Sequence, residues 1–179
     1  MSAQAESNLQ HGARKFHFLA VDAQDIPFGA SSFDVVIANH MLFHVPNRRK
    51  ALGEFQRVLK KGGRFFATTV GKENNRELNE LIVTIDPHLD RWSKELPDRF
   101  TFENGRIQLE EWFSEVRLTA YPDSLLITEP QPLIDYYLSS IEKVSESLRC
   151  ELTKFVRCAF ENTPVLHVTK ETGIFSAVR

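Results

Sequence analysis

Phe33-Asp34-Val35-Val36-Ile37-Ala38-Asn39-His40 is the segment from which the architecture can best be inferred. Residues 34–38 are β-branched and almost continuously apolar, which is typical of a strand buried on both faces of a parallel sheet. A loop containing Pro27 and Gly29 precedes it. The segment therefore predicts a strand of a parallel sheet in an α/β fold.

A helix is predicted after this strand, opened by Pro46 and Asn47. Its apolar positions form one stripe: Ala51, Leu52, Phe55, Val58 and Leu59. Lys60 and Lys61 suit the negative end of a helix dipole, and Gly62-Gly63 could form a left-handed cap there. A strand over 64–70 follows at once. This order is a βαβ crossover, which is right-handed by default.

The remaining elements are predicted from shorter patterns. Strands are expected at 16–21, 116–120 and 165–179, the last interrupted at Thr172-Gly173, where glycine permits a bulge or turn. Helices are expected at 7–15, 77–85, 109–113, 132–141 and 145–160.

Length and composition indicate one ordinary globular domain. The chain has 179 residues, of which 42% are hydrophobic and 26% charged. A net charge of −2 gives no electrostatic footprint for nucleic acid or an anionic membrane. Residues 1–15 are polar and lack a signal-peptide core, and no apolar run is long enough to span a bilayer. With only Cys150 and Cys158, the chain is expected to be cytoplasmic, with reduced thiols.

Asp22-Ala23 ends the predicted strand at 16–21, where open α/β sheets bind ligands. The Asp22 carboxylate could accept from an exocyclic amine, and the next backbone N–H could donate to a ring nitrogen, a pair of bonds that would recognise adenine. Alternatively, Asp22 caps the following turn.

Several motifs in order carry a family resemblance. They are Asp22-Ala23-Gln24-Asp25-Ile26-Pro27-Phe28, the segment 33–40 and Glu54-x-x-Arg57-Val58-Leu59-x-x-Gly62-Gly63. Together they resemble the middle of a class I S-adenosylmethionine (SAM) methyltransferase of the small-molecule "type 11" kind. The match covers about residues 7–71, and a weaker match occurs in the C-terminal strand at Lys170, Gly173 and Phe175. It departs at Lys61, where proline is usual.

The resemblance implies a SAM cofactor, a small-molecule methyl acceptor and an α/β, Rossmann-like mixed sheet whose last strands run antiparallel. It places Asp22 and Ala23 at the adenine and extends the cofactor-binding set to Gln24, Asn39 and His40. His44 matches a frequent family histidine that could accept a proton from the acceptor. The alternative role for His44 is to order its loop by hydrogen bonding to backbone.

His40 and His44 could share a zinc ion if they lay one turn apart on a helix. No third ligand accompanies them in the sequence, and the Glu of a His-Glu-x-x-His motif is missing. No metal site is therefore predicted.

No Gly-x-Gly-x-x-Gly loop occurs in the 179 residues. In the family this loop follows the first strand, so the resemblance implies an N-terminally truncated domain whose first two strands would precede Met1. SAM binding by the chain alone is then expected to be weak. The strand at 34–38 would also lose a neighbour, and a second copy could pair with its exposed edge to form a homodimer.

The chain is interpreted as a single partial domain over 1–179. It comprises a polar segment and helix at 1–15, a variable insertion at 72–130, and C-terminal helices and a last strand at 131–179. Aromatic residues of the insertion could line an acceptor pocket or simply fill the core: Trp92, Phe100, Phe102, Trp112 and Tyr121. Three functions compete: a small-molecule methyltransferase, a non-catalytic dimerising remnant of one, and another nucleotide-binding α/β protein.

Overall fold

The structure is a computed structural model that describes residues 16–89, 99–141 and 144–179. Its elements are β1 (Phe33–Asn39), η1 (Leu42–His44), α2 (Arg48–Val58), β2 (Leu59–Val70), α3 (Arg76–Ile85), η2 (Pro87–Leu89), α5 (Phe102–Glu110), β3 (Ser114–Ile127), α6 (Pro130–Ser140), α7 (Glu146–Asn162) and β4 (Leu166–Val178). The helix predicted at 7–15 and the aromatic Trp92 lie outside the described residues.

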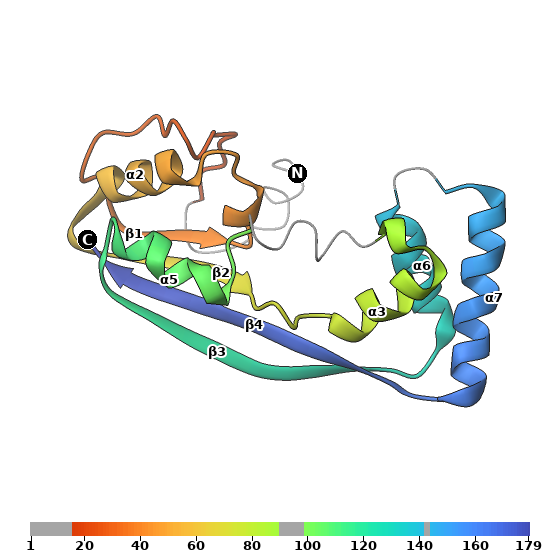
Figure 1. Cartoon of the computed structure of the whole chain (residues 1–179). Coiled ribbons are helices and arrows are strands. Elements are labelled where there is room, and N and C mark those ends of the chain that lie inside the picture. Colours follow the sequence, from red (N-terminus) through yellow and green to blue (C-terminus); the bar gives the residue numbers. More distant parts are fainter. Residues whose placement is uncertain (1–15, 90–98, 142–143) are drawn as a thin grey trace.

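The four strands form one mixed sheet in the order β1-β2-β4-β3 (Figure 1). β1 and β2 run parallel, and β4 is antiparallel to both β2 and β3. This arrangement confirms the predicted α/β class and the antiparallel last strands. Within the described residues β1 pairs only with β2, so it forms an edge of the sheet.

The helix predicted after β1 is confirmed as α2, but its end was predicted wrongly. The Asn47 side chain caps it by accepting from the Lys50 N–H at 3.0 Å. The helix stops at Val58, and the next residues already belong to β2. Gly62 does have a left-handed φ of 76°, but it lies in an irregular part of β2, where its N–H donates to the Arg179 carbonyl at 3.1 Å. Gly62 is thus a residue of β2 and does not cap α2.

The strand predicted at 16–21 is absent. Residues 16–22 have no regular secondary structure, and Leu19 is 63% exposed. A strand requires a hydrogen-bonded neighbour, and none of the described residues pairs with this segment. The apolar composition of residues 16–21 therefore favours a strand, but the described residues provide no strand with which it could pair.

Of the last two strands, β3 is longer than predicted and β4 is more regular than predicted. β3 covers 114–127 where 116–120 was expected, and β4 continues without a break through Gly173. A Cβ at this glycine would lie 2.7 Å from the Thr119 carbonyl oxygen, so glycine permits close strand approach and not a turn. The short helix expected at 109–113 is instead α5, which begins at Phe102.

Two separate hydrophobic cores stabilise the chain. In the first, α2 and α5 pack on one face of the sheet around Phe65 and Phe175, both fully buried. The second lies at the far ends of β3 and β4, where α3, α6 and α7 enclose Leu133, Leu152 and Val156 (Figure 1). We call this second unit the helical lobe.

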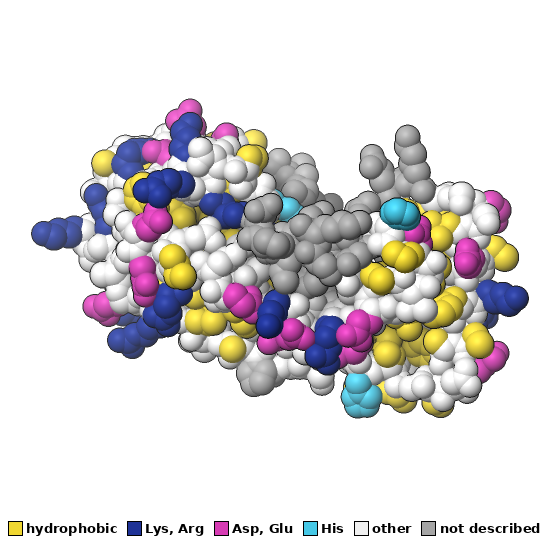
Figure 2. Space-filling model, viewed as in Figure 1, with side chains coloured by type: hydrophobic (Ala, Val, Ile, Leu, Met, Phe, Trp, Pro, Cys, Tyr) yellow, Lys and Arg dark blue, Asp and Glu magenta, His cyan; other side chains and the backbone are white. Residues whose placement is uncertain are grey.

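The surface carries both signs of charge, as Figure 2 shows for one face. Among the described residues no helix is both long and apolar enough to cross a membrane. Cys150 and Cys158 are exposed on α7 and are free thiols, as predicted.

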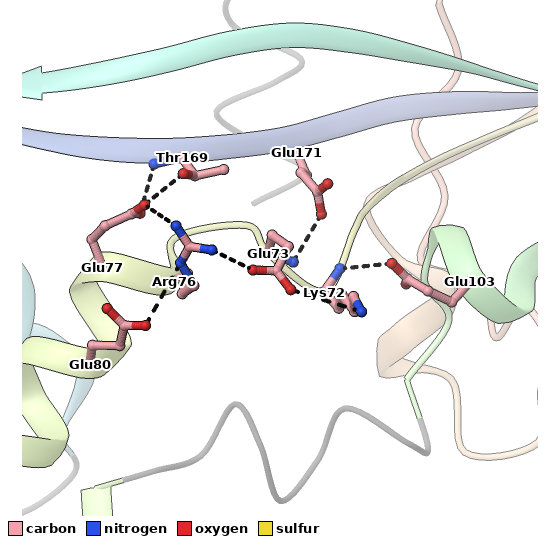
Figure 3. Close-up of polar contacts among 8 residues, drawn as sticks. All are labelled: Lys72, Glu73, Arg76, Glu77, Glu80, Glu103, Thr169 and Glu171. Atoms are coloured by element: carbon pink, nitrogen blue, oxygen red, sulfur yellow. Dashed lines mark hydrogen bonds and ion pairs between the residues drawn. The ribbon is translucent and has the colours of Figure 1, made fainter.

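A polar cluster fastens the helical lobe to the sheet (Figure 3). The Glu77 carboxylate on α3 accepts from the backbone N–H and hydroxyl of Thr169 on β4, at 2.8 and 2.6 Å. Arg76 bridges Glu77 to Glu73, whose N–H donates to Glu171 at 2.9 Å. Burial tends to raise the pKa of Glu77, but the bonds from Thr169 prevail and lower it to about 2.

Candidate functional site

The carboxyl ends of β1 and β2 bring polar groups together at one edge of the sheet. The Thr68 hydroxyl donates to Asn39 Oδ1 at 2.5 Å and accepts from the His40 N–H at 2.8 Å. This is the edge where open α/β sheets bind ligands. The sequence interpretation overlooked Thr68, although its place in the strand neighbouring β1 could have identified it.

His40 adopts an uncommon backbone conformation, with φ of 46°. Left-handed φ values are disfavoured for residues with a Cβ, and such residues cluster at functional sites. The turn at His40 ends β1 and directs the chain into η1. The hydrogen bond to Thr68 holds this turn in place.

Asp22 lies in a tight turn. Its carboxylate accepts from the Gln24 backbone N–H at 2.8 Å and from the Gln24 amide at 3.1 and 3.3 Å. These bonds, the backbone one first, lower the pKa of the Asp22 carboxyl. The capping role considered for Asp22 is therefore present. The exposed carboxylate stays ionised at neutral pH and retains acceptor capacity for an amine.

Gln24 connects this turn to the segment that follows β1. Its Oε1 accepts from the Asn47 N–H, 3.1 Å away, at the start of α2. Ala23, Met41 and Phe43 all pack against the first hydrophobic core. The turn at 22–24 and the loop at 40–47 are thus held on the same side of the fold.

Glu54 and Arg57, one turn apart on α2, form a long-range clamp. Glu54 accepts from Arg57 at 2.7 Å and from the Ile26 N–H at 2.8 Å. Arg57 also donates to the carbonyl oxygens of Ile26 and Phe28. Hydrogen bonds from Arg57, followed by that from Ile26, lower the pKa of Glu54 to about 2. The clamp fixes the loop that carries Asp22 onto α2.

His44 ends η1 with an exposed side chain, and its ring centroid lies 4.5 Å from that of Phe43. His40 is the other ring beside Phe43, with centroids 6.3 Å apart. Within the described ranges, no group of three or more His, Cys, Asp or Glu residues could hold a metal ion. The site therefore offers an ionised carboxylate, backbone groups at a strained turn and two imidazoles.

Comparison with known proteins finds a family whose matched residues include most of this site. Residues 1–67 match the methyltransferase-domain family of type 11. The matched methyltransferase segment includes the turn at 22–24, the edge at 39–40, η1 and α2.

Curated relatives of the chain are themselves methyltransferases. The chain is 44% identical over 96 residues to the sterol 4-C-methyltransferase strm-1 of Caenorhabditis elegans, which covers 52% of this chain and 28% of that protein. It is 45% identical over 74 residues to a demethylmenaquinone methyltransferase of Leptospira interrogans, covering 40% and 30% of the two chains. The chain thus spans less than a third of the length of these relatives.

Solved structures show that the fold is Rossmann-like and of the methyltransferase type. A Bacillus halodurans protein assigned as a methyltransferase has a TM-score of 0.63 and 19% identity, covering 97% of this chain and 76% of that one. The YcgJ protein of Bacillus subtilis has a TM-score of 0.61 and 17% identity, covering 100% and 78%. The likeness extends over the helical lobe as well as the sheet.

Proposed function

We propose that this chain belongs to a SAM-dependent methyltransferase that methylates a small molecule. The observation that carries the proposal is the polar edge formed by Asn39, His40 and Thr68, which lies within or beside the matched segment. Relatives such as the sterol and demethylmenaquinone methyltransferases support a small apolar acceptor.

The cofactor-binding residues proposed here are Asp22, Ala23, Gln24, Asn39 and His40. Asp22 would accept from the adenine amine, and the backbone of Ala23 and Gln24 would border the ring. Asn39 and His40 would contact the amino-acid part of SAM. The ionised carboxylate of Asp22 and the strained turn at His40 support these roles. When bound, SAM supplies the electrophilic methyl group.

His44 is proposed as the base that accepts a proton from the methyl acceptor. Its exposed imidazole on η1 supports this role, because the ring is open to a bound substrate and an imidazole nitrogen can accept a proton. The test is to compare His44→Gln with the unchanged chain in any preparation that transfers methyl groups. A loss of kcat with an unchanged SAM affinity is expected, and an unchanged kcat would remove His44 from the mechanism.

Calorimetric titration of the 179-residue chain with S-adenosylhomocysteine tests the proposal for the cofactor. We expect weak binding, because the sequence contains no Gly-x-Gly-x-x-Gly loop to approach the cofactor. A low-micromolar dissociation constant would show that the sequence interpretation of this missing loop is wrong. No heat at millimolar cofactor would instead favour the second candidate function, a non-catalytic remnant that dimerises.

The observation favouring dimerisation is the edge of the sheet at β1. Val35 and Ile37 are 46% and 65% exposed, and a groove of about 320 Å³ beside the strand is lined by apolar side chains such as Val21 and Phe28. An apolar edge strand presents unpaired backbone groups and invites pairing. We propose that β1 of a second copy covers it in a two-fold homodimer.

Two further assignments are proposed with this function. Residues 1–179 form one domain, in which 72–130 is the variable part and 131–179 the C-terminal helices and last strand. The free thiols of Cys150 and Cys158 support a cytoplasmic location.

A further inference from the structure

The helical lobe contains a large apolar cavity that the proposed cofactor edge does not use. It has a volume of about 560 Å³ and lies between α6, the far end of β3 and residues of α3 and β4. In Figure 2 hydrophobic side chains gather in a hollow on this lobe, at the lower right. Its apolar lining includes Leu78, Leu125, Leu126, Ile127 and Leu133. Cavities of this size accommodate small organic ligands.

A cation lies at the wall of this cavity. Lys170 on β4 is half-buried, and its Nζ donates to Asn75 Oδ1 at 2.8 Å. An ammonium has three hydrogens to donate, and in the described part of the chain Lys170 makes no ion pair within 4.0 Å. A neutral amide therefore holds a partly desolvated positive charge beside an apolar hollow.

The other charged residue of the cavity wall is Glu129, which precedes α6 and is exposed. Water and salt screen an exposed charge more than a half-buried one. Lys170 is therefore the less screened of the two charges on the cavity wall. The Tyr136 side chain, which is 49% exposed, adds a hydroxyl to the same wall.

We propose that this cavity binds an apolar carboxylic acid, with its hydrocarbon part among the leucines and its carboxylate on Lys170. Burial of the hydrocarbon would supply most of the affinity, because apolar area removed from water is the main favourable contribution. The charge-assisted bond to Lys170 would select the acid over a neutral molecule of the same shape. The proposal concerns binding alone and does not depend on methyl transfer.

Fluorescence titration of the 179-residue chain with 1-pyrenebutyrate and 1-pyrenebutanol tests the proposal. The two probes share the pyrene ring and differ in the head group, which is a charged carboxylate in the butyrate and a neutral hydroxyl in the butanol. We expect saturable one-to-one binding of the butyrate, at least about fivefold tighter than the butanol, since charge-assisted bonds are the stronger ones. Equal affinities would overturn the assignment of a carboxylate ligand, and no saturable binding would overturn the site.

Variants locate the bound probe. Lys170→Gln should weaken butyrate binding roughly tenfold and leave butanol unchanged, while Lys170→Arg should retain most of the affinity. Leu126→Asp, at a position 53% exposed, should weaken both probes. The matched controls are Lys154→Gln on α7 and Ile107→Asp on α5, both at exposed positions outside the cavity wall. Circular dichroism and thermal unfolding confirm folding of each variant, and equal losses in variants and controls would contradict the proposed site.

Discussion

The Glu54 carboxylate accepts a hydrogen bond from the Ile26 backbone N–H at 2.8 Å, which joins α2 to a loop 28 positions earlier in the chain. Arg57 completes the clamp by donating to the Ile26 carbonyl at 2.9 Å. The loop held in this way begins just after Asp22. The clamp therefore determines where the proposed adenine-binding carboxylate lies relative to the sheet edge.

Replacing Glu54 with Gln should lower the free energy of unfolding at pH 7 by about 1–3 kcal/mol, since hydrogen bonds to an ionised group are lost. Urea denaturation followed by circular dichroism measures this change. Asp34→Asn is the matched control, because Asp34 pairs with Lys60 on an exposed surface where such pairs contribute little. Equal effects of the two substitutions would show that the clamp is not important for stability.

The lowered pKa of Glu54 predicts that the free energy of unfolding depends on pH. This pKa is about 2 in the folded chain against an ordinary value of 4.5, so the unfolded state binds the proton more tightly. The stabilisation is therefore complete above about pH 4.5 and is lost as the pH falls from there towards 2. Urea midpoints measured across this window should fall less steeply for Glu54→Gln than for the unchanged chain. If the urea midpoints of the two chains fell equally with decreasing pH, the lowered pKa of Glu54 would be contradicted.

The left-handed turn at His40 gives a separate prediction. Glycine adopts a φ of 46° without steric cost, whereas a β-branched residue does not. His40→Gly should leave the free energy of unfolding within about 0.5 kcal/mol, and His40→Val should lower it by about 1–2 kcal/mol. Denaturant titration of both variants provides the comparison. A valine variant as stable as the glycine variant would mean that the turn relaxes to an ordinary conformation.

The exposed edge of the sheet predicts self-association. Ile37→Lys should convert a dimer to a monomer, because a charge on an edge strand opposes pairing. Light scattering at micromolar concentration measures the mass. Leu126→Lys is the control, since this leucine is also exposed but lies in the helical lobe. A monomeric unchanged chain would rule out pairing through β1.

The elements that sequence predicted best are those with long, regular patterns. β1 was recognised from its continuous β-branched run, and α2 from the spacing of its buried residues. α7 likewise agrees with the helix predicted at 145–160, and Ser145 caps it by accepting from the Leu148 N–H. The patterns of α2 and α7 reflect which side of each helix faces the core. The burial of β1 on both faces was predicted wrongly, because Val35 and Ile37 are exposed.

The errors occur where structure depends on a distant partner. Residues 16–21 are as apolar as a strand but have no hydrogen-bonded neighbour among the described residues. β3 extends far beyond its predicted length because β4 pairs with it as far as Ile127. In the candidate site, Asn39 and His40 were predicted, whereas the bond to Thr68 depends on the register of β1 and β2. Local periodicity does not specify such a register.

We propose that the turn at 22–24 and the edge at 39–40 form one side of a SAM site. The most direct test of this proposal is two-dimensional NMR of the isotope-labelled chain titrated with S-adenosylhomocysteine. We expect weak binding in which the largest chemical-shift changes occur at Asp22, Ala23, Gln24, Asn39 and His40. Asp22→Ala should reduce these changes. Shifts confined to the helical lobe, or unchanged spectra at millimolar cofactor, would contradict the proposal.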